Sequence, residues 1–225
     1  MLYAALGDSI TYGYTAGDEN SRYVARIQSS LSKQQAVNVF LHAKPGWTSK
    51  QLLKSAERVP DVIWAEARLI TILIGGNDLL RAVPWLIEGN TARIMRIAEK
   101  VRDNVAELVH LIKRPHSTIL LATLYNPFPN SLLAEEYTEA INKSLRMIAQ
   151  REKVHLADVR KHFFRRESEF IDGYRHGKLR DMRIRGNPIH PNDTGHEAIA
   201  QVFLRTYRRT AANARVTRAK AKASR

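Results

Sequence analysis

Short apolar runs alternate with longer amphipathic segments along most of the chain. The runs are rich in aliphatic and β-branched residues, and each ends at a turn or a polar residue, as strands do. They cover residues 2–6, 37–41, 69–74, 118–122 and 154–157. The run 69–74 is apolar at nearly every position, which predicts a central strand covered by helices on both faces.

The segments between these runs have helical periodicity. The first places Tyr23, Ile27, Ser30 and Leu31 on one face. Three more helices are expected at about 49–58, 91–113 and 132–151. The last helix is expected to begin near Asn192 and to cover residues 197–208. Strands that alternate with helices imply crossover connections and a parallel sheet. We therefore expect an α/β protein, a three-layer α/β/α sandwich with five parallel strands.

The stretch 165–186 interrupts this alternation. It contains seven Lys or Arg, four Asp or Glu and three glycines. A lid or substrate-contacting loop and an irregular, solvated excursion are equally consistent with that composition. The 225 residues fit one domain, which we place at 1–208, followed by a flexible basic tail at 209–225.

Charge and cysteine content narrow the class of protein. The formal net charge is +14, and eight basic residues follow Glu197, after which the chain has no acidic residue. Much of the basicity thus lies near the end of the chain, where it could hold nucleic acid or an anionic membrane weakly, although no obligatory nucleic-acid partner is expected. The chain has no cysteine, which rules out disulfides and thiolate metal sites. Because no signal peptide or membrane span is visible at its start, we expect a cytoplasmic protein.

Glycines and polar side chains collect where the predicted strands end. Gly7-Asp8-Ser9 follows the first run, Gly46 the second and Gly75-Gly76-Asn77-Asp78 the third. His190 precedes the last helix. Ligands of open α/β sheets bind beyond the carboxyl ends of the strands. A serine, a histidine and amide donors there are the groups that acyl transfer requires: a nucleophile, a base, and hydrogen bonds where negative charge develops.

In this order the motifs resemble those of the SGNH, or GDSL, hydrolase family. The matching segments are residues 7–13, Gly46, residues 75–78, and His190-Pro191-Asn192 with Gly195-His196. The resemblance implies a flavodoxin-like sheet of order 2-1-3-4-5 and hydrolysis of carboxylic esters without a metal or other cofactor. It also implies that Ser9 is the nucleophile and His190 the general base. The implied oxyanion hole consists of the Ser9 and Gly46 N–H groups and the Asn77 side chain, and Asp8 and Asp78 would brace the turns.

One position departs from the family pattern. The family usually has an aspartate three residues before the histidine, but this chain has Asn187. An asparagine supplies no negative charge to stabilise an imidazolium. Three interpretations stay open. Asn187 or a backbone carbonyl orients His190 in a weaker Ser–His dyad, Asp193 replaces the acid, or the enzyme is impaired. Asp193 reads more naturally as a helix cap, and the oriented dyad is favoured.

Apolar side chains near the strand ends suggest an acyl pocket. The residues expected to line it are Trp47, Leu79, Trp85 and Phe128. Esters of short to medium acyl chains are the first expectation for the substrate. A carbohydrate O-acetyl esterase and a catalytically weakened ligand-binding module are the alternatives, and the sequence leaves the oligomeric state open.

Overall fold

The computed structural model describes residues 1–81, 91–182 and 186–223, with side chains omitted at 91 and 214–223. Its centre is a parallel sheet of five strands in the order β2-β1-β3-β4-β5. The strands are β1 (Leu2–Gly7), β2 (Asn38–Ala43), β3 (Ala67–Leu73), β4 (Thr118–Ala122) and β5 (His155–Ala157). The expected fold class and strand order are confirmed.

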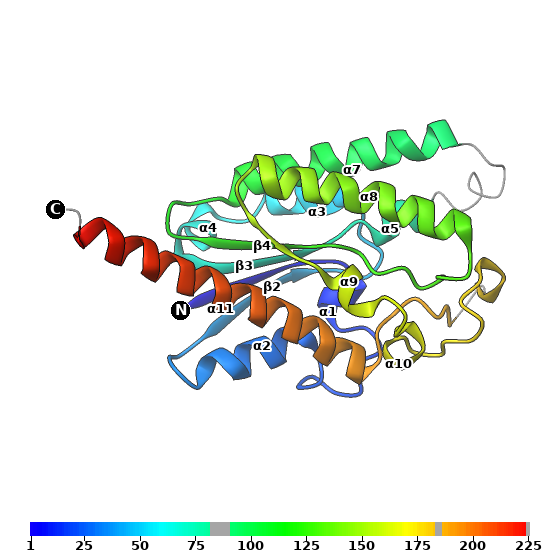
Figure 1. The fold of residues 1–225 in the computed structure, drawn as a ribbon, viewed down its shortest axis with the longest axis horizontal. Coiled ribbons are helices and arrows are strands. Elements are labelled where there is room, and N and C mark those ends of the chain that lie inside the picture. Colours follow the sequence, from blue (N-terminus) through cyan, green and yellow to red (C-terminus); the bar gives the residue numbers. More distant parts are fainter. Residues whose placement is uncertain (82–90, 183–185, 224–225) are drawn as a thin grey trace.

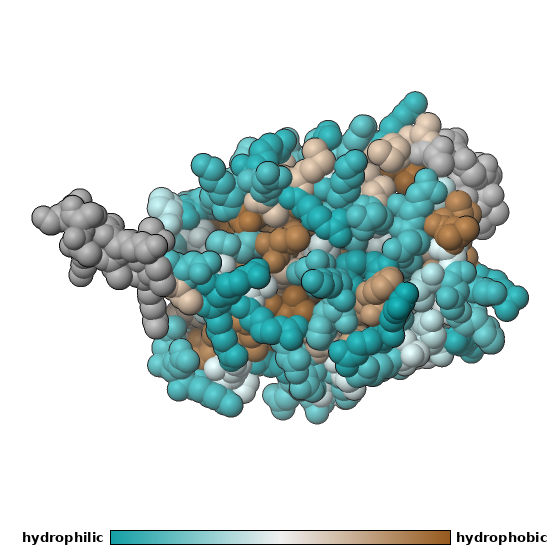
Figure 2. All heavy atoms as spheres, in the orientation of Figure 1, coloured by the Kyte–Doolittle hydropathy of each residue, from teal (hydrophilic) through white to brown (hydrophobic). Residues whose placement is uncertain are grey.

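Helices cover both faces of the sheet (Figure 1). One layer contains α3 (Ser49–Ala56), α4 (Asp61–Glu66), α7 (Thr91–Ile112) and α8 (Leu132–Arg151). The other contains α2 (Tyr23–Ser32), α9 (Val159–Phe163), α10 (Glu167–Phe170) and α11 (Asp193–Ala223). Figure 2 shows mostly hydrophilic residues on the side of the molecule seen in Figure 1, with apolar patches between them. The three-layer sandwich therefore buries its apolar residues in two cores, one on each side of the sheet.

Alternate residues of the strands divide between the two cores. Ala4 and Leu6 of β1 face the first layer, whereas Tyr3 and Ala5 face the second. This division follows from the two-residue period of a strand. A buried polar pair interrupts the apolar packing, because the hydroxyls of Tyr3 and Thr71 lie 3.0 Å apart and satisfy each other.

Several short helices were not expected from the sequence. They include α4, α9, α10, α1 (Ser9–Tyr12), α5 (Gly76–Leu80) and the 3-10 turn η1 (Leu179–Asp181). Segment 165–186 thus contains α10 and η1. Helix α11 continues to Ala223, so the backbone of most of the predicted tail is helical. Within the described residues, no helix has the length and apolar character needed to cross a membrane.

Candidate active site

The Gly7-Asp8-Ser9 turn places Ser9 at the carboxyl end of strand β1, which lies between β2 and β3. Ser9 is the first residue of α1, and the Asp8 carboxylate caps that helix by accepting the Ile10 N–H at 3.0 Å. A Cβ at Gly7 would lie 2.4 Å from the Leu73 carbonyl oxygen. Gly7 is needed for this close approach of β1 to β3, because a backbone carbonyl cannot swing aside as a flexible side chain can.

His190 lies within hydrogen-bonding distance of Ser9, with 3.0 Å between Nε2 and Oγ. This is the distance required of a general base and its nucleophile. Three consecutive carbonyls of the histidine loop accept hydrogen bonds from distant parts of the chain. The donors are Tyr125 Oη to Ile189 (2.6 Å), Asp172 N to His190 (2.9 Å) and Thr15 Oγ1 to Pro191 (3.0 Å).

The surroundings of His190 favour its neutral form. Its ring centroid is 4.7 Å from that of Tyr14, and the two planes are inclined by 52°. Burial lowers the pKa of His190, and the negative charge of Asp172 opposes that shift. A neutral imidazole at neutral pH can accept the Ser9 proton.

The three expected oxyanion donors lie on neighbouring strand ends. Ser9 and Gly46 donate their N–H groups to no residue in the described part of the chain. The Asn77 amide donates to the Trp47 carbonyl at 3.0 Å and, with a longer contact of 3.3 Å, to Asp8 Oδ2. The Trp47 contact fixes the amide plane, so one Nδ2 hydrogen is already committed and the other, weakly held, is available to an oxyanion.

Two carboxylates, the buried Asp8 and the partly buried Asp78, brace this edge of the sheet. Burial raises the pKa of Asp8 to about 7, while the Ile10 N–H hydrogen bond opposes the shift and the nearby charge of Asp78 adds to it. Asp78 accepts the backbone N–H of Ser49 at 2.8 Å and its hydroxyl at 2.7 Å. Asp78 therefore ties α5 to the start of α3, while Asp8 ties Ser9's helix to Asn77.

An apolar cavity opens at Ser9 and His190. Its volume is about 790 Å3, including its mouth open to solvent. The lining includes Leu79 and Phe128, as expected, and also Leu124, Thr138 and Leu179. Trp47 is not part of the lining and instead packs on His42, 5.3 Å between ring centroids. Trp85 lies outside the described residues.

Asn187 and Asp193, the two side chains considered as partners of His190, have different surroundings. Asn187 is half-buried, and its carbonyl accepts the Ile189 N–H at 2.8 Å. Asp193 Oδ1 accepts the Gly17 N–H at 2.8 Å. The helix cap is not Asp193, as the sequence suggested, but Asn192, whose Oδ1 accepts the Gly195 N–H at 2.9 Å. Asp193 is therefore engaged in holding the loop after α1.

Some contributors to the site were missed from the sequence. They are Tyr14, Arg81 and Asp172, and none stands in a recognisable motif. Arg81 Nη2 donates to the Gly46 carbonyl at 3.1 Å, which helps to hold that glycine in its turn. Leu179 belongs to segment 165–186, for which a substrate-contacting loop is one of the two interpretations, and Leu179 lines the cavity.

The parallel sheet with a Ser–His pair at its carboxyl edge is the arrangement that a hydrolase with a serine nucleophile requires. Residues 5–198 match the GDSL-like lipase/acylhydrolase family, and the chain belongs to that family. It is an ester hydrolase of the lipase/esterase type, as the motifs indicated.

Similar proteins include lipases and an esterase. The spore germination lipase LipC of Bacillus licheniformis is 26% identical over 212 residues, covering 89% of this chain and 93% of the lipase. The crystal structure of Lip_vut3, a lipase from a goat rumen metagenome, has a TM-score of 0.79 at 24% identity and covers 92% of this chain and 97% of its own. Axe2, an acetylxylan esterase from Geobacillus stearothermophilus, has a TM-score of 0.69 at 19% identity, with 91% and 93% covered.

Proposed function

We propose that the protein hydrolyses carboxylic esters of short to medium acyl chains through an acyl-enzyme at Ser9. The observation that carries this proposal is the apolar cavity that opens at the Ser9–His190 pair. Leucines from three elements line it: Leu73 of β3, Leu80 of α5 and Leu179 of η1. An acyl chain placed there would leave its ester carbonyl next to Ser9 Oγ.

The reaction has two halves, formation and hydrolysis of the acyl-enzyme, and His190 first takes up and then returns a proton in each. Ser9 Oγ attacks the carbonyl carbon while His190 Nε2 takes its proton, and the carbonyl oxygen becomes an oxyanion facing the Ser9, Gly46 and Asn77 donors. The carbon–oxygen bond to the alcohol then breaks, and His190 returns the proton to the departing alkoxide. Water repeats the sequence on the acyl-enzyme, releasing the acid and restoring the Ser9 hydroxyl.

The chain-length claim is tested with a panel of p-nitrophenyl esters from acetate to palmitate. We expect kcat/KM to peak at a short to medium chain and to fall to background in Ser9→Ala. Ala134→Leu narrows the apolar cavity, since Ala134 of α8 lines it, and should move the optimum toward shorter chains. Ala65→Leu on α4, an exposed site far from the cavity, is the control.

Carbohydrate acetyl esters are the alternative outcome of the same panel. The structural similarity to an acetylxylan esterase motivates this second candidate. The lining is rich in leucine side chains, which a longer acyl chain would contact over more of its length than an acetyl group, so the lining favours the longer acyl chains. Acetate as the best substrate, with activity on acetylated oligosaccharides, would contradict the proposal and support deacetylation.

A further inference from the structure

We propose that Asp172 is a positioning residue that supplies the negative charge missing at Asn187. Its carboxylate would stabilise the imidazolium that His190 becomes when it takes the Ser9 proton. This inference rests on the proposed Ser9–His190 chemistry. It concerns a segment, between α10 and η1, that carries no family motif in the sequence.

Backbone pairing places Asp172 opposite His190. Ile171 and Pro191 form an isolated antiparallel bridge. On either side of it, Asp172 N donates to the His190 carbonyl and Asn192 N donates to the Phe170 carbonyl, each at 2.9 Å. Pro191 has no N–H, and this pairing places it at a non-hydrogen-bonded position, where none is needed.

Directly opposed residues of an antiparallel pair extend to the same face, with Cβ atoms about 5 Å apart. Asp172 and His190 are such a pair. Both side chains therefore begin on the same side of the bridge, and the charge of Asp172 acts on the imidazole ring. At this range a charge acts on the ring through space, without requiring a direct hydrogen bond.

The other charged and titratable groups around His190 are engaged elsewhere. Asp8 accepts the Ile10 N–H, and Asp193 accepts the Gly17 N–H. His196 of α11 is buried with a pKa lowered to about 4, chiefly by burial, so it stays neutral near pH 7. Tyr14 contacts His190 through its aromatic ring. Of the described carboxylates, Asp172 is the one whose charge raises the pKa of His190 against the effect of burial.

Asp172 is suited to this role because its charge is not neutralised nearby. It is exposed, and no salt bridge joins it to another described residue. Exposure also limits the effect, since water and salt screen the charge. The contribution should be much smaller than that of the buried aspartate in a serine-protease triad, where replacement by asparagine lowers kcat about 10⁴-fold.

The test compares the pH dependence of kcat/KM in wild type and Asp172→Asn. The acid limb reports the groups that titrate in the site of the free enzyme. Asp8, with a pKa of about 7, is common to both proteins, so the difference between their limbs reports His190. Removing a negative charge should lower the pKa of His190, so the limb should move to lower pH by about half a unit, and kcat should fall by up to about threefold. Asp172→Glu should restore most of the wild-type kcat and most of the wild-type position of the acid limb. Asp103→Asn makes the same change of charge at an exposed residue of α7, and it should alter neither kcat nor the acid limb.

Two further measurements make the outcome decisive. Added salt should shift the acid limb of the wild type to lower pH, toward that of Asp172→Asn, and should leave the acid limb of the variant nearly unchanged. A direct NMR titration of His190, identified by the signal lost in His190→Asn, reads its pKa without any substrate. An unchanged pKa in folded Asp172→Asn overturns the inference, even if kcat falls. Failure of the proposed function would appear separately, as wild-type activity that Ser9→Ala does not reduce.

Discussion

At the scale of single residues, Ser9 and His190 keep a 3.0 Å contact although the position that usually holds the acid is an asparagine. The histidine loop is held by three hydrogen bonds to consecutive carbonyls. These bonds hold the backbone of the loop that carries His190. What Asn187 cannot supply is charge, and the amide replaces the negative group that would stabilise an imidazolium.

Asn187→Asp should accordingly raise ester turnover. We expect kcat to increase about tenfold or more, because a carboxylate stabilises the protonated base. The measurement is kcat on the best ester of the panel, with circular dichroism to confirm folding. In this background Asp172→Asn should cost less than it does in wild type, since the two charges serve the same imidazole. Turnover that stays the same or falls in a folded Asn187→Asp would count against the account.

The sequence was informative about residues that stand in motifs and silent about those that act through tertiary contacts. Ser9, Asn77 and His190 were expected at the sheet edge, and the structure brings them together. Tyr14 and Asp172 reach His190 only because the loops after α1 and α10 fold against it. No local pattern encodes such contacts, since they depend on the relative position of distant segments.

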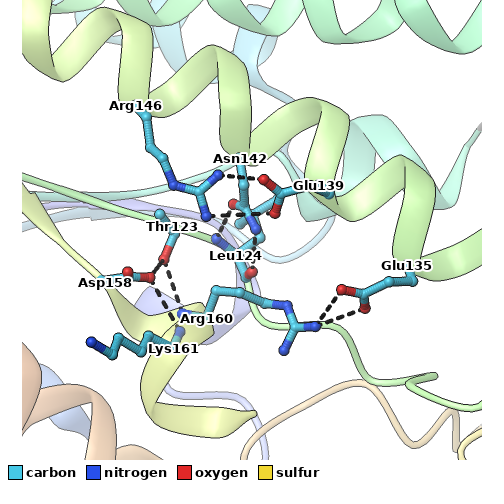
Figure 3. A network of polar contacts seen from close by, with 9 residues as sticks. All are labelled: Thr123, Leu124, Glu135, Glu139, Asn142, Arg146, Asp158, Arg160 and Lys161. Atoms are coloured by element: carbon cyan, nitrogen blue, oxygen red, sulfur yellow. Dashed lines mark hydrogen bonds and ion pairs between the residues drawn. The ribbon is translucent and has the colours of Figure 1, made fainter.

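At the scale of elements, a polar network braces the wall of the cavity (Figure 3). The Arg160 guanidinium of α9 donates to both carboxylate oxygens of Glu135 on α8, at 2.5 and 2.7 Å. Glu135 in turn accepts a hydrogen bond of 2.8 Å from Asn126, which lines the cavity. Arg160 also lies 3.7 Å from the buried Glu167. The network thus couples α8, α9 and the loop after β4.

Arg160→Met should destabilise the fold by about 3 kcal/mol, because it leaves the buried Glu167 carboxylate without its cation. The control lies in the same figure: Arg146→Met removes an ion pair with Glu139 whose side chains are 38% and 51% exposed. That change should cost less than about 1 kcal/mol. Urea unfolding measures both variants. Equal losses would show that the Arg160 network is no more stabilising than a surface pair.

Short elements were the least predictable part of the fold. Helices α1 and α9 have four and five residues, too few for an apolar period to stand out. Their caps are the informative signals: Asp8 accepts the Ile10 N–H, and Asp158 accepts the Lys161 N–H at 3.1 Å. An aspartate at these positions is equally typical of an ordinary turn, so the sequence alone does not distinguish a short helix from a turn.

At the scale of the whole molecule, strand order and layers followed from the alternation of elements and from the family motifs. Two long helices, α7 and α8, lie close to their expected bounds, whereas α11 extends beyond its expected range. They were predictable because their apolar faces extend over many turns. The division into a domain at 1–208 and a tail at 209–225 stays a prediction, and helix α11 crosses that boundary without a break.

Activation of Ser9 as a nucleophile is the property on which the proposed function depends most. Reaction of the folded protein with a fluorophosphonate, followed by peptide mass spectrometry, tests this directly. We predict one adduct per chain, located on Ser9, with labelling strongly reduced in His190→Asn because the base is lost. An absence of adduct on folded wild-type protein, or an adduct on another residue, would contradict the account and favour a ligand-binding module.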